Sequence, residues 1–216
     1  MSDGRLIIGN KRYSSWSLRG WLAVHLARLD VEEVVFPLAG GSTPAIKEAT
    51  PSGTVPYLEH HGARIWESLS IIEYCSEHVA LWPMAPVPRA MARSVAAEMH
   101  AGFRELRMAM PFNIGREFPG QRRTPGALAD IARIEAIWAE CLEISGGPFL
   151  FGLDMSGADI MFAPVVCRFL TWQPELSATS LRYMEQVRGH ALMRRWYDEA
   201  LAEPESWQLD KFENPA

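Results

Sequence analysis

The 216-residue sequence predicts a protein of class α/β plus all-α, in which an N-terminal domain of order βαβαββα precedes an all-helical C-terminal domain. Three observations predict it. Up to residue 79, short apolar runs alternate with helical periodicity; residues 80–89 hold three prolines; and beyond residue 89 apolar side chains recur every three or four positions. We therefore expect domains at residues 1–79 and 90–216, joined by a linker at residues 80–89.

The N-terminal half begins with the apolar run Leu6-Ile7-Ile8, which predicts a strand, and continues into a helix that ends near Leu29. Residues 31–38 predict a second strand because their β-branched and apolar side chains end in a proline. A strand, a helix and a strand so close together imply a parallel pair with a crossover. The remaining elements are a short helix at residues 43–49, a hairpin whose strands end at Glu59 and span residues 63–66 with His61-Gly62 as its turn, and a helix from Glu67-Ser68 to near His78.

The C-terminal half shows helical periodicity throughout. A long helix is expected from Arg89 to Met110, a break at residues 111–126, and a second helix through residues 128–142. Ser156 and Asp159 have the spacing of a capping box, which predicts that the next helix begins there. Shorter helices are expected at residues 180–186 and 190–201, and the polar tail from Glu203 is expected to wrap or fray.

Composition excludes several classes of function. Hydrophobic residues make up 48% and charged residues 22% of the chain, as in ordinary globular proteins. A formal net charge of −5 and the lack of a block of Lys and Arg argue against nucleic-acid binding. The sequence shows no signal-peptide pattern and no run long enough to span a membrane, so a cytoplasmic protein is expected.

The cysteines and histidines give no sign of a metal site. Cys75, Cys141 and Cys167 are far apart and lie in apolar helical contexts, so we expect them to be reduced and buried. The chain has no C-x-x-C pair, and no spacing of His and Cys suggests metal ligands, so no metal is expected.

Residues 10–19 form the junction between the first strand and the first helix. Ser14, Ser15 and Ser17 lie where the helix begins. The unpaired N–H groups and the positive end of the helix dipole stabilise an anion at such a place. Serine is also an ordinary helix N-cap, so two interpretations remain open: capping alone, or capping together with anion binding.

Four motifs, in order, resemble those of the cytosolic glutathione transferases. The stretch Tyr13-Ser14-Ser15-Trp16-Ser17-Leu18-Arg19 is similar to the serine motif of zeta-like members, and Gly53-Thr54-Val55-Pro56 to the segment that carries the family's cis-proline. Glu67-Ser68 is similar to the glutathione clamp, and Ser156-Gly157-Ala158-Asp159 to the folding motif of the helical domain. The resemblance implies a thioredoxin-like N-terminal domain, a helical C-terminal domain and a serine-type member of the family.

The resemblance also implies the residues that handle glutathione. Ser14 is the first candidate for the hydroxyl that stabilises the thiolate, Ser15 the second, and Tyr13 a further one because other classes use a tyrosine. The tripeptide would pair with the backbone of Val55, and its γ-glutamyl end would bind Glu67 and Ser68. The implied glutathione-binding residues are Thr54, Val55, Pro56, Glu67 and Ser68.

The second substrate is expected against the long helix of the C-terminal half. The residues expected to line its pocket are Tyr13, Trp16, Arg104, Arg107, Met108 and Phe112, with Asn113 nearby and Arg12 or Arg19 available for a carboxylate. Alternatively, the arginines are solvated or form ion pairs, and Met108 and Phe112 belong to the core.

Trp16 stands where zeta-class members carry a cysteine, which weakens an assignment to maleylacetoacetate isomerase chemistry. The lack of cysteine in the motif also argues against omega-type thiol reductases.

The expected function is that of a glutathione transferase, which activates glutathione as a thiolate for attack on a small electrophile, as in detoxification. Two alternatives remain: a glutathione-dependent cis-trans isomerase of the maleylacetoacetate or maleylpyruvate type, and a non-catalytic binding module with the same fold. Glutathione is the expected co-substrate, without a metal. The resemblance implies a homodimer, with the helix after Glu67 and the helix from Arg89 facing the partner.

Overall fold

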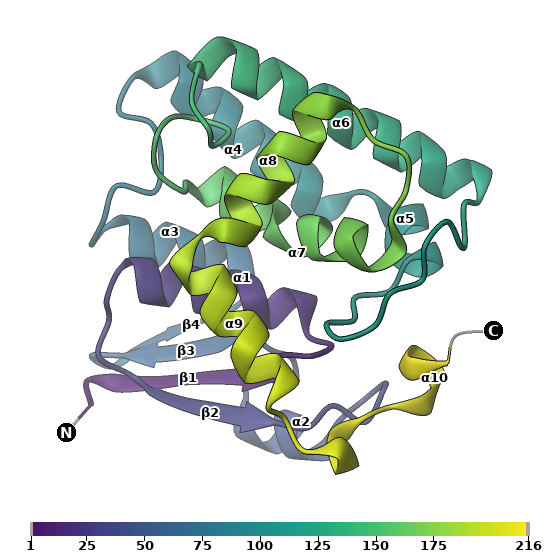
Figure 1. Ribbon diagram of the computed structural model, residues 1–216. Helices are drawn as coiled ribbons and strands as arrows, with labels where there is room; N and C mark the ends of the chain where they lie inside the picture. The colour runs from purple at the N-terminus through teal and green to yellow at the C-terminus, as the bar shows by residue number, and fades with distance from the viewer. Residues whose placement is uncertain (1, 215–216) are drawn as a thin grey trace. The chain divides into compact units, whose positions relative to one another are not determined.

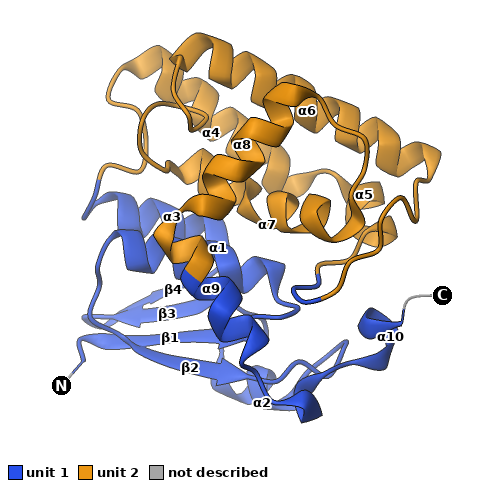
Figure 2. Ribbon diagram, viewed as in Figure 1, with its two compact units in different colours: residues 1–79, 113–115, 195–216 blue, residues 80–112, 116–194 orange. Residues whose placement is uncertain are grey.

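The structure is a computed structural model that describes residues 2–214, and it divides into two compact units (Figure 2). Unit 1 comprises residues 1–79, 113–115 and 195–216, and unit 2 comprises residues 80–112 and 116–194. Residues 195–216 thus group with the N-terminal residues, although the sequence pattern assigned them to the helical half. The reason is that their side chains pack and pair with residues 10–40 within unit 1.

Unit 1 is built on a four-stranded sheet of order β2-β1-β3-β4. The strands are β1 (Gly4–Gly9), β2 (Glu32–Phe36), β3 (Tyr57–His60) and β4 (Ala63–Ile65). β1 is parallel to β2 and antiparallel to β3, with Ile7 opposite both Val34 and Tyr57. Leu6, Ile7 and Ile8 are at most 1% exposed, so this central strand is covered on both faces.

Three helices complete the predicted βαβαββα order: α1 (Ser15–Leu26), α2 (Pro44–Ala49) and α3 (Ser68–Ser76). In Figure 1, α1 and α3 lie on one face of the sheet and pack against each other. α1 also approaches Pro56 closely at Gly20, where an added Cβ would lie 2.8 Å from the proline ring. The predicted thioredoxin-like arrangement of this half is confirmed, while α1 ends at Leu26, earlier than the expected Leu29.

The C-terminal part of unit 1 consists of the end of α9 (Ala191–Leu201), the 3₁₀-helix η1 (Glu205–Trp207) and α10 (Asp210–Glu213). Trp196 of α9 is fully buried, with its ring centroid 5.3 Å from that of Trp21 on α1. The tail expected to wrap or fray wraps: Lys211 donates to the carbonyl of Gly40, and Glu213 is buried.

Unit 2 is all-helical over the residues described. Its helices, apart from the start of α9, are α4 (Pro86–Ala101), α5 (Arg104–Ala109), α6 (Pro125–Ser145), α7 (Gly157–Trp172) and α8 (Ala178–Gly189). The capping box is present: the Ser156 hydroxyl accepts from the Asp159 N–H, and the Asp159 carboxylate accepts from the Ser156 N–H. Almost every side chain of α7 is buried, so this helix forms the core of the unit.

Two boundaries in unit 2 differ from the sequence prediction. α4 begins at Pro86, inside the expected linker at residues 80–89, because proline is tolerated in the first turn of a helix. The expected single helix from Arg89 to Met110 is broken between α4 and α5. Gly102 is extended, with no room for a Cβ beside the Glu98 carbonyl, and Phe103 has a left-handed φ of 60°.

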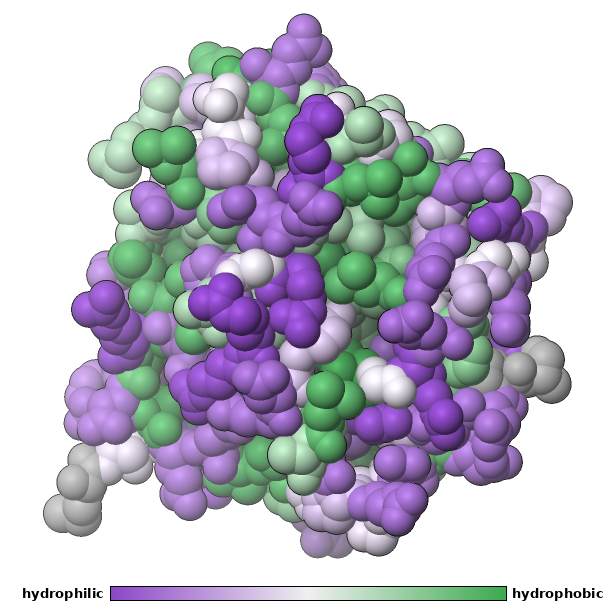
Figure 3. Space-filling view, viewed as in Figure 1, coloured by the Kyte–Doolittle hydropathy of each residue, from purple (hydrophilic) through white to green (hydrophobic). Residues whose placement is uncertain are grey.

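The surface agrees with the composition. On the face drawn in Figure 3, hydrophilic side chains predominate and hydrophobic ones are exposed in smaller groups. Among the helices that the structure describes, none combines the length and the apolar character needed to cross a membrane.

Candidate active site

A cavity of about 440 Å³ opens at the N-terminus of α1, entirely within unit 1. Six predicted site residues from two motifs lie around it, since the serine motif and the loop before Pro56 converge there. The lining residues are Tyr13, Ser14, Ser15, Trp16, Leu38, Gly41, Ser42, Thr43, Ile46, Lys47, Gly53, Thr54 and Val55.

The serines at this cavity are held by a short network of hydrogen bonds. Ser14 is the N-cap of α1, and its Oγ accepts from the backbone N–H of Ser17 at 3.3 Å. The Ser14 hydroxyl donates to the Ser17 Oγ at 2.7 Å, and that oxygen also accepts from the N–H of Gly9 at 2.9 Å. Ser14 therefore caps α1, and the same residue lines the cavity.

The loop that faces the serines carries the cis Val55–Pro56 peptide bond. Thr54 is exposed, Val55 half-buried and Pro56 buried. Among residues 2–214, the backbone N–H and C=O of Val55 have no hydrogen-bond partner. These two groups can pair with an extended peptide in the way that a neighbouring strand would.

Glu67 and Ser68 lie at the start of α3 and do not line the cavity. Glu67 is the exposed N-cap residue, and Ser68 is the fully buried first residue of the helix. The Ser68 Oγ has no hydrogen-bond partner among the described residues. A buried hydroxyl without a partner is costly.

Tyr13 contributes its ring to the cavity, but its hydroxyl is engaged elsewhere. The hydroxyl donates to the Glu213 carboxylate at 2.5 Å and accepts from the N–H of Leu209 at 3.1 Å. Burial and the hydrogen bond to Glu213 raise the pKa of Tyr13 to about 12. The Tyr13 hydroxyl is therefore already engaged both as a donor and as an acceptor.

The two arginines considered for a substrate carboxylate are also engaged. The Arg12 guanidinium donates to both carboxylate oxygens of Glu213, each at 2.9 Å, in a bidentate ion pair. Arg19 is fully buried and lies over the Trp16 ring, 4.6 Å from its centroid. Both residues therefore support the polypeptide around the serines.

Three carboxylates, those of Glu33, Glu199 and Glu203, pair with the polar groups of residues 10–12, just before the serines. Glu203 accepts from the backbone N–H groups of Lys11 and Arg12 and from the Asn10 side chain. The Lys11 ammonium donates to Glu33 and Glu199. The pKa of Glu203 is raised by burial. The hydrogen bonds from Asn10, Lys11 and Arg12 offset only part of that rise.

The other residues predicted for the second substrate belong to unit 2. Arg104 and Met108 are exposed, whereas Phe112 is 3% exposed and lies in the core. Arg107 donates to the carbonyls of Met99 and Gly102 and so caps the end of α4, and burial lowers its pKa. Asn113, fully buried in unit 1, donates to the Phe212 carbonyl at 2.8 Å.

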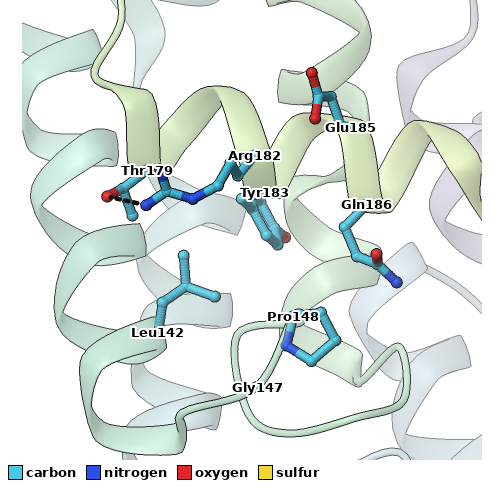
Figure 4. Close-up of a pocket in the computed structure, with 8 residues that line it drawn as sticks. All are labelled: Leu142, Gly147, Pro148, Thr179, Arg182, Tyr183, Glu185 and Gln186. Carbon is cyan, nitrogen blue, oxygen red and sulfur yellow. Dashed lines mark hydrogen bonds between the residues drawn. The ribbon is translucent and has the colours of Figure 1, made fainter.

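A separate cavity of about 510 Å³ lies in unit 2 between α6, α8 and the loop at residues 147–148 (Figure 4). None of the predicted site residues lines it. Arg182 donates to Thr179 at 3.2 Å, and the Tyr183 hydroxyl donates to the buried Asp159 at 3.0 Å. Two of its polar side chains, Arg182 and Tyr183, thus make hydrogen bonds within unit 2.

Sequence reasoning missed Lys47, an exposed cation of α2 that lines the first cavity. The predicted short helix at residues 43–49 contains it, but no periodicity indicates that it faces the serines. It also missed Glu203 and Glu213, because nothing in a polar tail identifies its partners.

Comparison with known proteins agrees with this fold. Residues 13–78 match the sequence profile of the glutathione S-transferase N-terminal domain. The chain is 28% identical over 174 residues to a probable maleylacetoacetate isomerase of Caenorhabditis elegans, covering 77% of this chain and 79% of that protein. It is 27% identical over 185 residues to the maleylacetoacetate isomerase of Rattus norvegicus, covering 82% and 84%.

Among solved structures, a glutathione transferase homologue from Burkholderia with bound glutathione superposes with a TM-score of 0.70. The match covers 93% of this chain and 99% of that one at 20% identity. The chain therefore has the fold of glutathione transferases, with a thioredoxin-like unit. Residues 13–78 are similar to the N-terminal domain of the glutathione S-transferase family.

Proposed function

We propose that the chain is a glutathione transferase that binds glutathione in the cavity of unit 1 and presents its thiolate to a small electrophile. The observation that carries the proposal is the convergence on one cavity of Ser14 and Ser15, at the start of α1, with Thr54 and Val55. A helix N-terminus faces a backbone able to pair with a peptide, which is the combination that a thiol tripeptide requires.

The chemistry lies in the charge of the sulfur. A thiolate is a far stronger nucleophile than a thiol, and free thiols are mostly protonated at neutral pH. A hydroxyl hydrogen bond from Ser14, together with the positive end of the α1 dipole, lowers the pKa of the bound thiol. Ser15, the first residue of α1, is the second candidate for this hydrogen bond.

Ser17 has a positioning role in this proposal. Hydroxyl groups both donate and accept, so the bond between Ser14 and Ser17 can run in either direction. When a thiolate is bound, Ser17 donates to Ser14, and the Ser14 proton turns to the sulfur. The N–H of Gly9 continues to donate to the Ser17 oxygen, so every group stays paired.

The arms of the tripeptide match the remaining groups. The cysteinyl backbone pairs with Val55, and the γ-glutamyl ammonium and carboxylate go to Glu67 and the unpartnered hydroxyl of Ser68. Lys47, on the cavity wall, offers a counter-charge for the glycine carboxylate. Thr54 and Pro56 complete the proposed glutathione-binding residues.

The experiment that tests the proposal joins binding to turnover. Wild-type protein should be retained on glutathione-agarose, be eluted by free glutathione, and conjugate 1-chloro-2,4-dinitrobenzene with saturation in glutathione. Retention without turnover against this and a panel of other electrophiles would support the non-catalytic module. A lack of both would contradict glutathione binding itself.

Isomerisation is the second candidate, because relatives named maleylacetoacetate isomerase align with most of the chain. In this reaction the thiolate adds to a conjugated double bond, the bond rotates, and the thiolate leaves. Trp16 takes the place of the cysteine of zeta-class members. Glutathione-dependent isomerisation of maleylacetoacetate, lost in Ser14→Ala, would favour this candidate over transfer.

The finer assignments rest on the resemblance. We propose that the electrophile contacts Tyr13, Trp16, Arg104, Arg107, Met108 and Phe112, that the protein is a cytoplasmic homodimer, and that it serves detoxification. Light scattering coupled to size-exclusion chromatography tests the dimer. Photolabelling with an electrophile analogue, followed by mapping of modified peptides, tests the pocket.

A further inference from the structure

Three potential metal ligands lie close together in unit 1, where β1 begins and β3 ends. This is the end of β3 that is remote from Pro56. One nitrogen each of His60 and His61 and one carboxylate oxygen of Asp3 all lie within 4.8 Å of one another. The His61 Nε2 is 3.7 Å from the Asp3 Oδ2. These side chains are separate from the cavity at the start of α1, whose lining includes none of them.

The backbone holds the three residues together. In the antiparallel pairing of β1 with β3, Gly4 is opposite His60, so Asp3 comes beside His61. The His61 N–H donates to the Asp3 carbonyl at 3.0 Å. His61 and Gly62 form the two-residue turn of the β3–β4 hairpin, with φ values of 47° and 84°, as a type I′ turn requires. Figure 1 shows the start of β1 beside the end of β3.

His60 is arranged as a metal ligand with a supporting partner. It is 3% exposed, so its ring position is fixed by packing. Its Nδ1 is 2.8 Å from the Tyr74 hydroxyl, which leaves Nε2 for the ligand cluster. Metal-binding histidines usually hydrogen-bond through their other nitrogen, which fixes the tautomer.

Asp3 is exposed and adds a carboxylate to the two imidazole rings.

We propose that Asp3, His60 and His61 bind a divalent first-row transition metal ion of the zinc type. Two imidazole nitrogens, which are borderline ligands, joined by one carboxylate oxygen suit Zn²⁺, Co²⁺ or Ni²⁺ rather than Mg²⁺ or Ca²⁺. Ligand atoms around a tetrahedral zinc are about 3.4 Å apart, so the cluster closes around the ion by small side-chain movements.

A tetrahedral site built on three protein ligands leaves a position for water or a fourth side chain. Because the cluster lies at the far end of β3 from Val55-Pro56, the ion would tie the start of β1 to the β3–β4 turn. It has no part in the thiol chemistry, so its binding can be tested independently of glutathione turnover.

The test is a calorimetric titration of the full chain, free of any histidine tag, with Zn²⁺, supported by the visible spectrum of the Co²⁺ form. We expect a single Zn²⁺ per chain, tetrahedral Co²⁺ absorption, and a rise in the unfolding temperature on binding. Asp3→Asn and His61→Ala, both at exposed side chains, should each weaken Zn²⁺ binding at least tenfold. Tyr74→Phe should weaken it by about tenfold through the orientation of His60.

Asp154→Asn is the matched control, since Asp154 is an exposed aspartate of unit 2 that lies outside the cluster. Its Zn²⁺ affinity should equal that of the wild type. The proposal is overturned if the wild type binds no stoichiometric Zn²⁺, or if Asp3→Asn and His61→Ala, folded by circular dichroism, bind it as tightly as the wild type.

Discussion

The hydroxyl of Tyr13 donates a 2.5 Å hydrogen bond to the carboxylate of Glu213, a residue 200 positions further along the chain. The same carboxylate receives both arms of the Arg12 guanidinium. The side chains of Arg12 and Glu213 are 10% and 4% exposed, so this is a buried ion pair. Arg12 and Tyr13, which directly precede the serines, are therefore held in place by Glu213 of the C-terminal segment.

Glu213→Ala should destabilise the protein by about 3 kcal/mol, because it leaves the Arg12 charge buried without its partner. The free energy of unfolding, measured by urea denaturation, checks this. Glu205→Ala is the control, since Glu205 is exposed and lies in the same segment. Equal stability of the two variants would show that the pair contributes nothing.

Ser14→Ala should leave glutathione bound while raising the pKa of its thiol by roughly 1–2 units, because a hydrogen bond to the charged sulfur is lost. The thiolate absorbance of bound glutathione, titrated against pH, measures this pKa. We expect kcat/KM at neutral pH to fall roughly 10- to 100-fold.

Ser94→Ala, on the exposed face of α4, should behave as the wild type in both measurements. An unchanged thiol pKa in Ser14→Ala would transfer the role to Ser15. The helix-capping role predicts a loss of stability in Ser14→Ala whichever serine contacts the thiol.

Glu67→Gln should raise the KM for glutathione by about tenfold while kcat changes little, because it removes a charge that binds the γ-glutamyl ammonium in ground and transition states alike. Steady-state kinetics with varied glutathione measure both constants. Glu77→Gln, at the other end of α3, is the control. A normal KM in Glu67→Gln would contradict the proposed clamp.

Gly20→Ala should destabilise the protein by about 1–3 kcal/mol, since overpacking forces the backbone or the ring to move. The added Cβ would lie 2.8 Å from the Pro56 ring and 3.5 Å from Ile71. Movement of Pro56 should also raise the KM for glutathione. Gly189→Ala, where no atom lies within 4 Å of the added Cβ, should retain wild-type stability and KM.

Glu33 should make the protein sensitive to acid. Burial alone would raise its pKa, but hydrogen bonds from His25, Lys11 and Trp21 lower it to about 2, from an ordinary value of 4.5. A carboxylate with a lowered pKa stabilises the fold above its unfolded-state pKa, and that contribution is lost as the pH falls through the folded-state pKa.

We therefore expect the free energy of unfolding to fall by up to about 3 kcal/mol between pH 4.5 and 2. Urea denaturation at stepped pH measures it. In Glu33→Gln this part of the pH dependence should be absent, whereas Glu32→Gln, at an exposed neighbour, should keep it. Equal slopes for both variants would contradict the assignment.

The predictable parts of the fold are those encoded by neighbours in sequence. The run Leu6-Ile7-Ile8, the turn His61-Gly62 and the capping box at Ser156 each carry their own local signal, and each gives the expected element. The continuous helix through Gly102 was predicted from apolar spacing, which is blind to backbone conformation. Only the space beside the Glu98 carbonyl shows why the helix stops there.

The candidate site shows the same difference between features with a local sequence signal and features that depend on tertiary packing. Ser14, Ser15, Thr54 and Val55 line one cavity, because both segments flank elements of one sheet. The engagement of Arg12 and Tyr13 could not be predicted, since Glu213 carries no motif and meets them only through tertiary packing. Likewise, spacing along the chain separates Asp3 from His60, and strand pairing brings them together.

Because residues 195–214 complete unit 1, the order of synthesis matters. The ribosome makes the sheet and its first helices well before Glu199, Glu203 and Glu213, the carboxylates that neutralise or cap residues 11–13. During that interval Lys11 already has Glu33 as a partner, whereas Arg12 lacks Glu213 and Trp21 lacks the Trp196 ring beside it. Unit 1 is therefore completed last, although its strands are translated first.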